Sequence, residues 1–245
     1  MRPVKQAELT PARRAQLGAP PAQRRAAGTP ASSTRVAEPF WPAQVTAAAA
    51  LVLYLTLPHA LIMGPRWLVP GVEGVLLLGL IITTPTRHHK QSARLRAVIV
   101  CLVGLVSLTT LISLILLARF LLDGSHARGH ALLFAGAVLW LTNVLVFGIW
   151  YWELDDGGPA HRLAPSKATR TPDFLFPQMA QPALFPGWRP GFVDYLYTSY
   201  TNATAFSPTD AMPLSAVAKL LMATQSLIAL ITILLVVARA VNVLG

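Results

Sequence analysis

The chain has 245 residues, of which 54% are hydrophobic and only 12% are charged, and its mean hydropathy is +0.53. This composition excludes a water-soluble globular protein and is typical of an integral membrane protein. The formal charge of +10 does not indicate nucleic acid as a partner, because the basic residues lie mostly between apolar segments, as membrane topology requires. The single cysteine, Cys101, excludes an intrachain disulfide and a cysteine-based metal site.

Residues 1–42 are predicted to form a disordered, basic cytoplasmic tail. They contain seven prolines, six arginines and Lys5 but few large apolar side chains before Phe40 and Trp41. Such a segment buries too little surface to offset the entropy lost on ordering. We therefore expect a solvated tail, with contact to anionic lipid as the alternative.

Residues 43–152 are predicted to form four transmembrane helices, because their apolar runs are close to or above the length that crosses a hydrocarbon core of ~30 Å. The runs cover residues 43–63, 67–84, 95–122 and 130–152. The second run is short and carries a proline, a glycine and Glu73 near its start, which leaves another kind of hairpin open for the first two runs. The fourth run ends in Trp150-Tyr151-Trp152, an aromatic belt typical of a membrane face.

The distribution of Lys and Arg predicts the orientation, because short basic loops resist translocation. The tail has seven, residues 86–96 have four and residues 153–191 have four more, whereas the two opposite loops offer only Arg66 and Arg128. We expect the N-terminus and these three basic segments on the cytoplasmic side of a bacterial inner membrane.

Residues 153–191 are predicted to be an irregular cytoplasmic loop, because seven of these thirty-nine positions are proline. The loop starts with three acidic residues, Glu153, Asp155 and Asp156. They are expected to form a solvated helix end, with the gathering of cations at a pore mouth as the alternative.

Residues 192–245 have the layout of a pore loop. Residues 192–204 are moderately apolar and too short to span, which suits a re-entrant half-helix. An irregular segment follows, and Pro213 begins a final apolar run to Gly245. Irregular backbone is tolerated at membrane depth only where protein or water satisfies it, so the segment after the half-helix is predicted to line a wet pore or a subunit interface.

The predicted pore and selectivity segment has seven residues. They are Thr204, Ala205, Phe206, Ser207, Pro208, Thr209 and Asp210. Hydroxyls, exposed carbonyls and the Asp210 carboxylate are the groups that can replace an ion's water shell. Asp210 also has a simpler interpretation as the cap of the last helix, and the two roles are compatible.

The stretch from Tyr197 to Asp210, followed by Pro213, Ser215 and Lys219, resembles the pore loop of two-span potassium-type channels. In that family a hydroxyl-rich pore helix precedes a threonine, the run Val-Gly-Tyr-Gly-Asp and a proline three residues on. Without gaps, Thr204 falls on the threonine, Asp210 on the aspartate and Pro213 on the proline. The same C-terminal part also resembles an uncharacterised family of bacterial integral membrane proteins with no assigned activity.

The departures from the potassium pattern argue against potassium selectivity. Ser207 and Thr209 replace both filter glycines, and Pro208 replaces the aromatic residue. Glycine lets the potassium filter line up its carbonyls, whereas proline fixes its own φ angle and restricts the residue before it. The predicted orientation also inverts the loop relative to a potassium channel, unless the number of spans differs by one.

Polar residues inside the predicted spans give two further expectations. Gln225, Thr232 and Arg239 are seven residues apart and share one helix face, so they are predicted to line the pore, with hydrogen bonding between helices as the alternative. Glu73 is expected to pair with Arg119 or Arg239, because all three lie near the non-cytoplasmic ends of their helices and opposite charges at equal depth lower each other's burial cost.

The sequence thus predicts an all-α polytopic membrane protein with about five transmembrane helices and one re-entrant pore half-helix. We expect a homotetrameric ion channel, since one pore loop cannot enclose a conduit by itself. The alternatives are a secondary transporter or small-solute permease, and a non-transporting scaffold. No catalytic motif, metal site or cofactor site stands out, so the expected partners are inorganic ions, the lipid bilayer and other copies of the chain.

Overall fold

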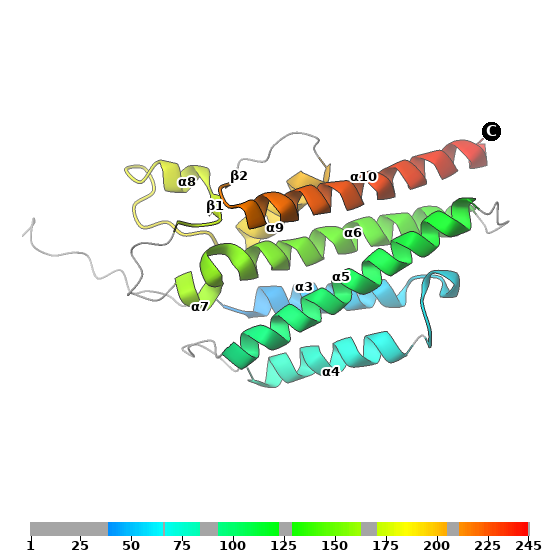
Figure 1. Ribbon diagram of the computed structural model, residues 1–245, viewed down its shortest axis with the longest axis horizontal. Coiled ribbons are helices and arrows are strands. Elements are labelled where there is room, and N and C mark those ends of the chain that lie inside the picture. The colour runs from blue at the N-terminus through cyan, green and yellow to red at the C-terminus, as the bar shows by residue number, and fades with distance from the viewer. Residues whose placement is uncertain are drawn as a thin grey trace, which may run out of the picture. The chain divides into compact units, whose positions relative to one another are not determined.

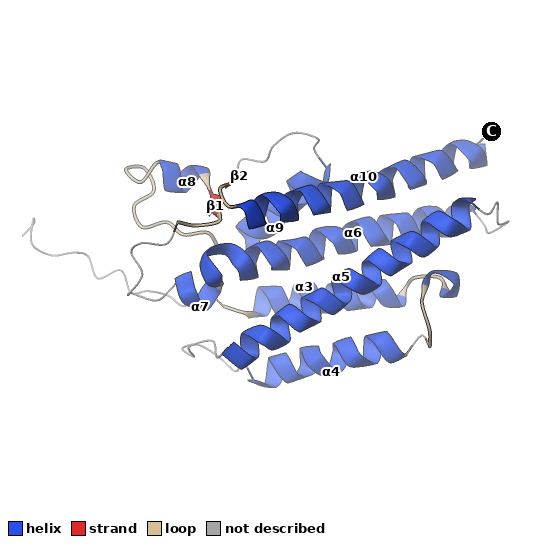
Figure 2. Cartoon of the chain, in the orientation of Figure 1, coloured by secondary structure: helices blue, strands red, loops and turns tan. Residues whose placement is uncertain are grey.

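The computed structural model describes residues 39–65, 67–83, 93–122, 129–162, 171–204 and 211–244, and this part of the chain is mainly helical (Figure 1; Figure 2). Of the predicted tail, only the last four residues belong to it. The helices are α3 (Trp41–Leu55), α4 (Leu68–Thr83), α5 (Ala93–Leu122), α6 (Gly129–Leu154), α7 (Pro159–Arg162), α8 (Pro177–Ala180), α9 (Phe192–Thr204) and α10 (Ala216–Leu244). Two 3₁₀ turns, η2 (His59–Leu61) and η3 (Asp155–Gly157), and two short strands, β1 (Phe174–Leu175) and β2 (Met212–Pro213), complete the set.

Three of these helices, α5, α6 and α10, are long and apolar enough to cross a membrane. Their apolar stretches cover Leu95–Leu121, His130–Gly157 and Ala216–Val241. With a rise of 1.5 Å per residue, about 26 residues extend for about 39 Å, more than the ~30 Å of a bilayer's hydrocarbon core. The described chain is therefore that of a helical protein embedded in a membrane.

The first apolar run forms a shorter helix than the sequence predicts, and both of the first two helices are short. The first was expected to continue to Met63, but α3 ends at Leu55 and the chain then turns through η2. Pro58 explains the break, because proline has no N–H to continue the helical hydrogen bonds and disfavours helical backbone at the residue before it. With 15 and 16 residues, α3 and α4 are about 22–24 Å long and do not by themselves span ~30 Å.

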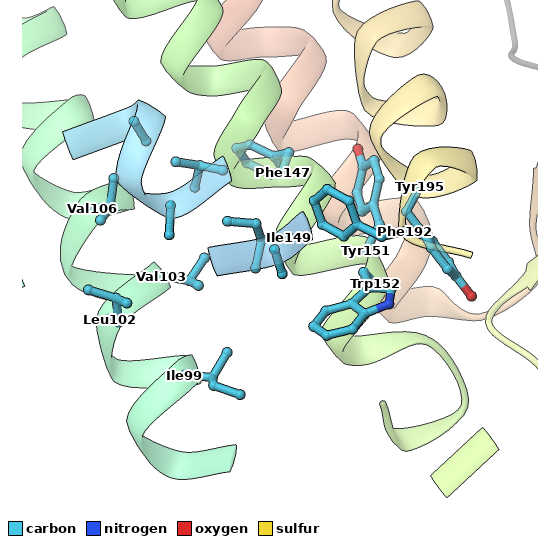
Figure 3. Packing of buried hydrophobic residues seen from close by; sticks show 14 of the residues in the cluster. Ile99, Leu102, Val103, Val106, Phe147, Ile149, Tyr151, Trp152, Phe192 and Tyr195 are labelled. Carbon is cyan, nitrogen blue, oxygen red and sulfur yellow. The ribbon is translucent and has the colours of Figure 1, made fainter. Parts of the chain in front are cut away.

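Helix α6 lies at the centre of the packing and contacts α3, α5, α9 and α10, whereas α4 packs against α3 and α5. Figure 3 shows one cluster of buried side chains that joins these helices. On one side, α5 contributes branched residues such as Ile99 and Val103. On the other, aromatic rings from α6 and α9 gather, among them Trp152, Phe192 and Tyr195.

Four helix ends meet at one end of the bundle, which we call the cap end. The ring of Trp152, near the end of α6, lies 5.4 Å from that of Phe40 before α3 and 5.7 Å from that of Phe192 at the start of α9. Arg96, near the start of α5, forms an ion pair with Glu153, with 3.5 Å between Nε and Oε1. The three basic segments predicted to be cytoplasmic all adjoin these helix ends.

Candidate functional site

Helix α9 starts where the sequence provides an N-terminal cap. The Asp194 carboxylate accepts a hydrogen bond from the backbone N–H of Gly191, with 2.7 Å between Oδ2 and N. This is one half of a capping box, and the negative charge in the first turn also favours the helix dipole. At the other end, the Thr204 hydroxyl bonds back to the Tyr200 carbonyl. The helix predicted over residues 192–204 is thus confirmed with the same bounds.

Helix α9 runs antiparallel to the second half of α6. From the cap end inward, the rings of Phe192 and Trp152 meet edge to face, and Leu196 packs closely against Gly148. One turn further, the Ser199 hydroxyl donates to the Val144 carbonyl (2.6 Å), and the Trp140 indole N–H then points to the Ala203 carbonyl (3.4 Å). The contacts advance by three or four residues on both helices, so their relative register is fixed along the whole of α9.

Gln225 of α10 is the centre of a buried polar network between the three helices. Its side-chain amide donates to the carbonyl (2.9 Å) and the hydroxyl (2.7 Å) of Ser199 on α9. Its side-chain carbonyl accepts from the Tyr151 hydroxyl of α6 and from the Asn202 amide of α9 (2.9 Å). Gln225 is fully buried, so these bonds replace the water that an amide would otherwise need.

Other polar side chains extend this network. Asn202 also donates to the backbone carbonyl of Met222 on α10 (3.0 Å), and Asn143 of α6 donates to the backbone carbonyl of Gln225 (3.3 Å). The Ser226 hydroxyl donates to the Asn202 side-chain oxygen (3.2 Å). Each of the three helices therefore contributes side chains, and α9 is hydrogen-bonded on both of its flanks.

The chain enters and leaves this junction at the same end. Helix α9 begins at the cap end and ends beside Trp140, twelve residues and about 18 Å along α6 from Trp152. The described chain resumes at Ala211, and the next residue, Met212, pairs with Leu175 beside Phe174, whose backbone N–H bonds to Asp155 at the cap end. The helix is therefore too short to cross, and both of its flanking described segments lie on one side.

Most of the predicted selectivity segment lies outside the described residues. Thr204 is the last described residue before the gap and is exposed at the inner end of α9. The six residues that remain in the prediction, Ala205, Phe206, Ser207, Pro208, Thr209 and Asp210, are not described.

The residues predicted to line the pore on α10 face the bundle. Gln225 and Thr232 have exposed fractions of 0% and 1%, and Arg239 is half-buried. Gln225 bonds to α6 and α9, whereas within the described part of the chain the Thr232 hydroxyl bonds only to the Ile228 carbonyl of its own helix. Hydrogen bonding between helices is therefore seen for Gln225 and not for Thr232. The opposite face of α10 is apolar and exposed, with Val217, Leu220, Leu227, Leu234 and Val241 along it.

Asp155 ties the start of α9 to the end of α6. Its carboxylate accepts from the backbone N–H groups of Asp173 (2.7 Å) and Phe174 (3.1 Å) and from the Tyr195 hydroxyl. The guanidinium of Arg162 bonds to the Asp155 carbonyl (2.9 Å) and lies 5.1 Å from the centre of the Tyr195 ring. A carboxylate with three donors in a buried place is a strong structural anchor.

The anchored segment also positions the start of α10. β1 pairs antiparallel with β2, with Leu175 opposite Met212 and Phe174 opposite Pro213. Asp155 and Glu153 each have an exposed fraction of 1%. The expectation of a solvated acidic helix end is therefore wrong for these two residues, because each finds a partner that only the folded chain brings close: Arg96 for Glu153, and the loop backbone for Asp155.

Glu73 lies at a separate position between α4 and α5. Its Oε1 atom is 3.4 Å from the Thr109 hydroxyl, and its exposed fraction is 1%. Within the described part of the chain it forms no ion pair with Arg119 or Arg239. The ion pair with Arg119 does not form because Arg119 lies too far along α5: ten residues, or about 15 Å, separate it from Thr109, which contacts Glu73.

Comparison with known proteins gives no relative for this chain: no family model, no curated protein and no solved structure matches it.

Proposed function

We propose that the protein is a pore-loop ion channel formed by several copies of the chain. The observation that carries the proposal is the course of the chain around α9, which starts at the cap end, stops part of the way along α6 and is followed by a described segment back at the cap end. A half-helix between two long apolar helices is the layout that channels use to place a short segment at membrane depth.

The polar network supports the proposal, because a half-helix in a membrane needs to be held by protein. Helix α9 is about two thirds as long as the hydrocarbon core is thick, and its buried face is bonded to α6 and α10 through Ser199, Asn202 and Gln225. Its other face is exposed and carries Val193, Tyr197, Tyr200 and Thr204. Hydroxyl groups on this exposed face suit a wet cavity or a neighbouring copy of the chain better than lipid.

Several copies are needed because one loop cannot surround a conduit. Copies arranged with closed cyclic symmetry can surround a conduit on their common axis. We propose four copies, with the exposed faces of α9 and α10 turned toward this axis or toward a neighbouring copy. In this arrangement, α3 and α4 accompany the three long helices in the bilayer, giving five membrane helices and one re-entrant half-helix. The Lys and Arg counts support an orientation with the cap end on the cytoplasmic side, and the membrane that we propose is a bacterial inner membrane.

The residues of the predicted selectivity segment indicate part of the ion preference. Ser207, Pro208 and Thr209 stand where a potassium filter needs glycine and an aromatic residue, so we propose a selectivity other than that of potassium channels. The Asp210 carboxylate favours cations, because a ring of carboxylates concentrates them at a pore mouth.

The first experiment is the subunit count of the purified protein in lipid nanodiscs, combined with disulfide crosslinking in a Cys101→Ser background. We expect four copies, and Thr204→Cys should crosslink one copy to another. Val75→Cys is the matched control, since Val75 is also exposed but lies on α4, which packs against α3 and α5. A single copy without crosslinks would contradict the shared pore and favour a permease or a scaffold.

Conductance is the second measurement. Tetramers in planar bilayers should carry ionic current, and Asp210→Asn should change the preference between cations and anions while the subunit count stays the same. An unchanged ion preference would restrict Asp210 to a structural role. The channel would be contradicted if assembled tetramers of known orientation carried no current at either voltage polarity over a range of pH.

A further inference from the structure

Glu73 is a carboxyl group isolated in an apolar part of the bundle. Its helix, α4, packs against α3 and α5, and no other charged residue lies in α3 or α4. Between Arg96 and Arg119, α5 has no charged residue either. The group is almost completely buried, and its Oε2 atom has no hydrogen-bond partner within the described part of the chain.

The hydrogen bonds of Thr109 show where a proton is needed. The Thr109 Oγ1 atom lies 3.0 Å from the Val106 carbonyl oxygen, 3.1 Å from that of Leu105 and 3.4 Å from Glu73 Oε1. A hydroxyl has one proton, and the two backbone carbonyls can only accept. The proton of Thr109 serves one of these three acceptors, and both carbonyls are nearer to it than the Glu73 oxygen. When the proton goes to a carbonyl, the oxygen lone pairs of Thr109 face Glu73, and the contact is favourable only if the carboxyl group itself carries a proton.

The neighbouring helices offer an ionised Glu73 no nearby positive charge in the described part of the chain. From α3 the titratable group that interacts with it is Tyr54, which is itself buried. From α5 the nearest charged residue is Arg119, about 15 Å along the helix from Thr109. An unpaired carboxylate in such a place is costly, and a buried acid usually avoids the cost by keeping its proton.

We propose that Glu73 is a proton-binding site inside the helical bundle, which in its neutral form donates a hydrogen bond to Thr109 and so fastens α4 to α5. Release of the proton places an unpaired negative charge between the two helices, and the α3–α4 hairpin loosens from α5. This site is independent of the proposed channel, because α9 and α10 supply none of its groups.

Infrared spectroscopy of the protein in nanodiscs tests the protonation directly. At neutral pH, the wild type should show the C=O stretch of a protonated carboxyl group that Glu73→Gln removes. Thr109→Val should keep this band but shift it to the frequency of a carboxyl group without a hydrogen-bond acceptor. A carboxylate band lost in Glu73→Gln, with no change in the protonated region, would overturn the proposal.

Labelling with an apolar carbodiimide gives an independent test. The O–H of a protonated carboxyl group adds across one N=C bond, the proton goes to nitrogen, and the O-acylisourea rearranges to a stable N-acylurea with no atom lost and no redox change. Mass spectrometry of the peptide with residue 73 should show this adduct at neutral pH, and a water-soluble carbodiimide should not form it. The buried acids Glu153 and Asp155 are internal controls, since both have donors and should react less.

The pH dependence distinguishes a proton site from a polar contact that only stabilises. Glu73→Gln keeps the shape and a donor for Thr109, so it should fold, and its thermal stability should fall less than that of the wild type when the pH is raised. The sign follows from linkage, because the folded state holds a proton that the unfolded chain releases at neutral pH. Equal pH dependence of both proteins, or no adduct at residue 73, would overturn the proposal.

Discussion

Two regions of the bundle are held together by different forces. The α6–α9–α10 region is connected by side-chain hydrogen bonds that meet at Gln225, and Asp155 anchors its cap end. The α3–α4–α5 region is packed mainly through small and branched apolar residues such as Ala47, Ala50 and Val103, and the carboxyl group of Glu73 on α4 contacts the Thr109 hydroxyl of α5.

The position of a helix is specified most tightly where directional hydrogen bonds hold it. Apolar side chains tolerate small sliding and rotation at modest cost, whereas a buried amide with several partners has few alternative positions. Helix α9 packs Phe192 and Tyr195 into the aromatic cluster at the cap end, but further inward the hydrogen bonds of Ser199 with Val144 and Gln225 hold it, so its position there depends on directional bonds. Mutations that remove such bonds should therefore affect α9 more than comparable changes affect α4.

The largest effect is expected for Asp155→Asn. The variant loses the charge that strengthens three hydrogen bonds, so we expect a loss of about 1.5–3 kcal/mol in stability. Thermal unfolding in nanodiscs measures it. Asp156→Asn is the matched control: Asp156 has φ of 49°, which Asn tolerates well, so its stability should stay close to that of the wild type. Equal losses in both variants would contradict the anchor.

Gln225→Leu should have the next largest effect. It removes four hydrogen bonds between helices, each of which is worth about 0.6 kcal/mol on average in membranes, so we expect a loss of about 2 kcal/mol. Thr232→Val is the control, because Thr232 is as buried but bonds only to the Ile228 carbonyl of its own helix. A larger loss for Thr232→Val than for Gln225→Leu in thermal unfolding would show that the network does not hold α9.

Gly148→Ala tests the close approach of α9 to α6. A Cβ atom at this position would lie 2.9 Å from Leu196 Cδ1 and 3.2 Å from Leu196 Cα, so α9 would have to move. After the gain from the better helix propensity of alanine, we expect a net loss of about 1 kcal/mol. Gly104→Ala on α5 meets no atom within 4 Å and should be neutral or stabilising by up to about 1 kcal/mol. Equal thermal stabilities would contradict the comparison.

The smallest effect is expected at the Trp150–Ser107 hydrogen bond between α5 and α6. The indole N–H of Trp150 donates to the Ser107 hydroxyl (2.9 Å), and Ser107 in turn bonds to the Val103 carbonyl of its own helix. Trp150→Phe removes one bond and leaves Ser107 satisfied, so thermal unfolding should report a loss of only about 0.6 kcal/mol from this bond. A loss as large as that of Gln225→Leu would mean that the two regions do not differ.

Local sequence patterns were sufficient for the elements that depend on local properties. The apolar runs of α5, α6 and α10 determine three long helices, since a continuous apolar stretch of this length has few other stable conformations in a membrane. The bounds of α9 also follow from the sequence, because Asp194 stands at the capping position three residues after Gly191, and Ser207-Pro208 follows soon after Thr204. Pro58 was a local signal too, and it ends α3 earlier than the length of the apolar run suggests.

Only the tertiary structure decided the partners of the polar side chains. The seven-residue spacing of Gln225 and Thr232 places them on one face but does not say whether that face meets water or α6. Glu73 is near Thr109 and not near Arg119, and Asp155 and Glu153 are buried, because residues far apart in the chain meet there. The sequence by itself determined the helices, whose stability is local, whereas the partner of a buried polar group depends on the offset between helices, which packing alone sets.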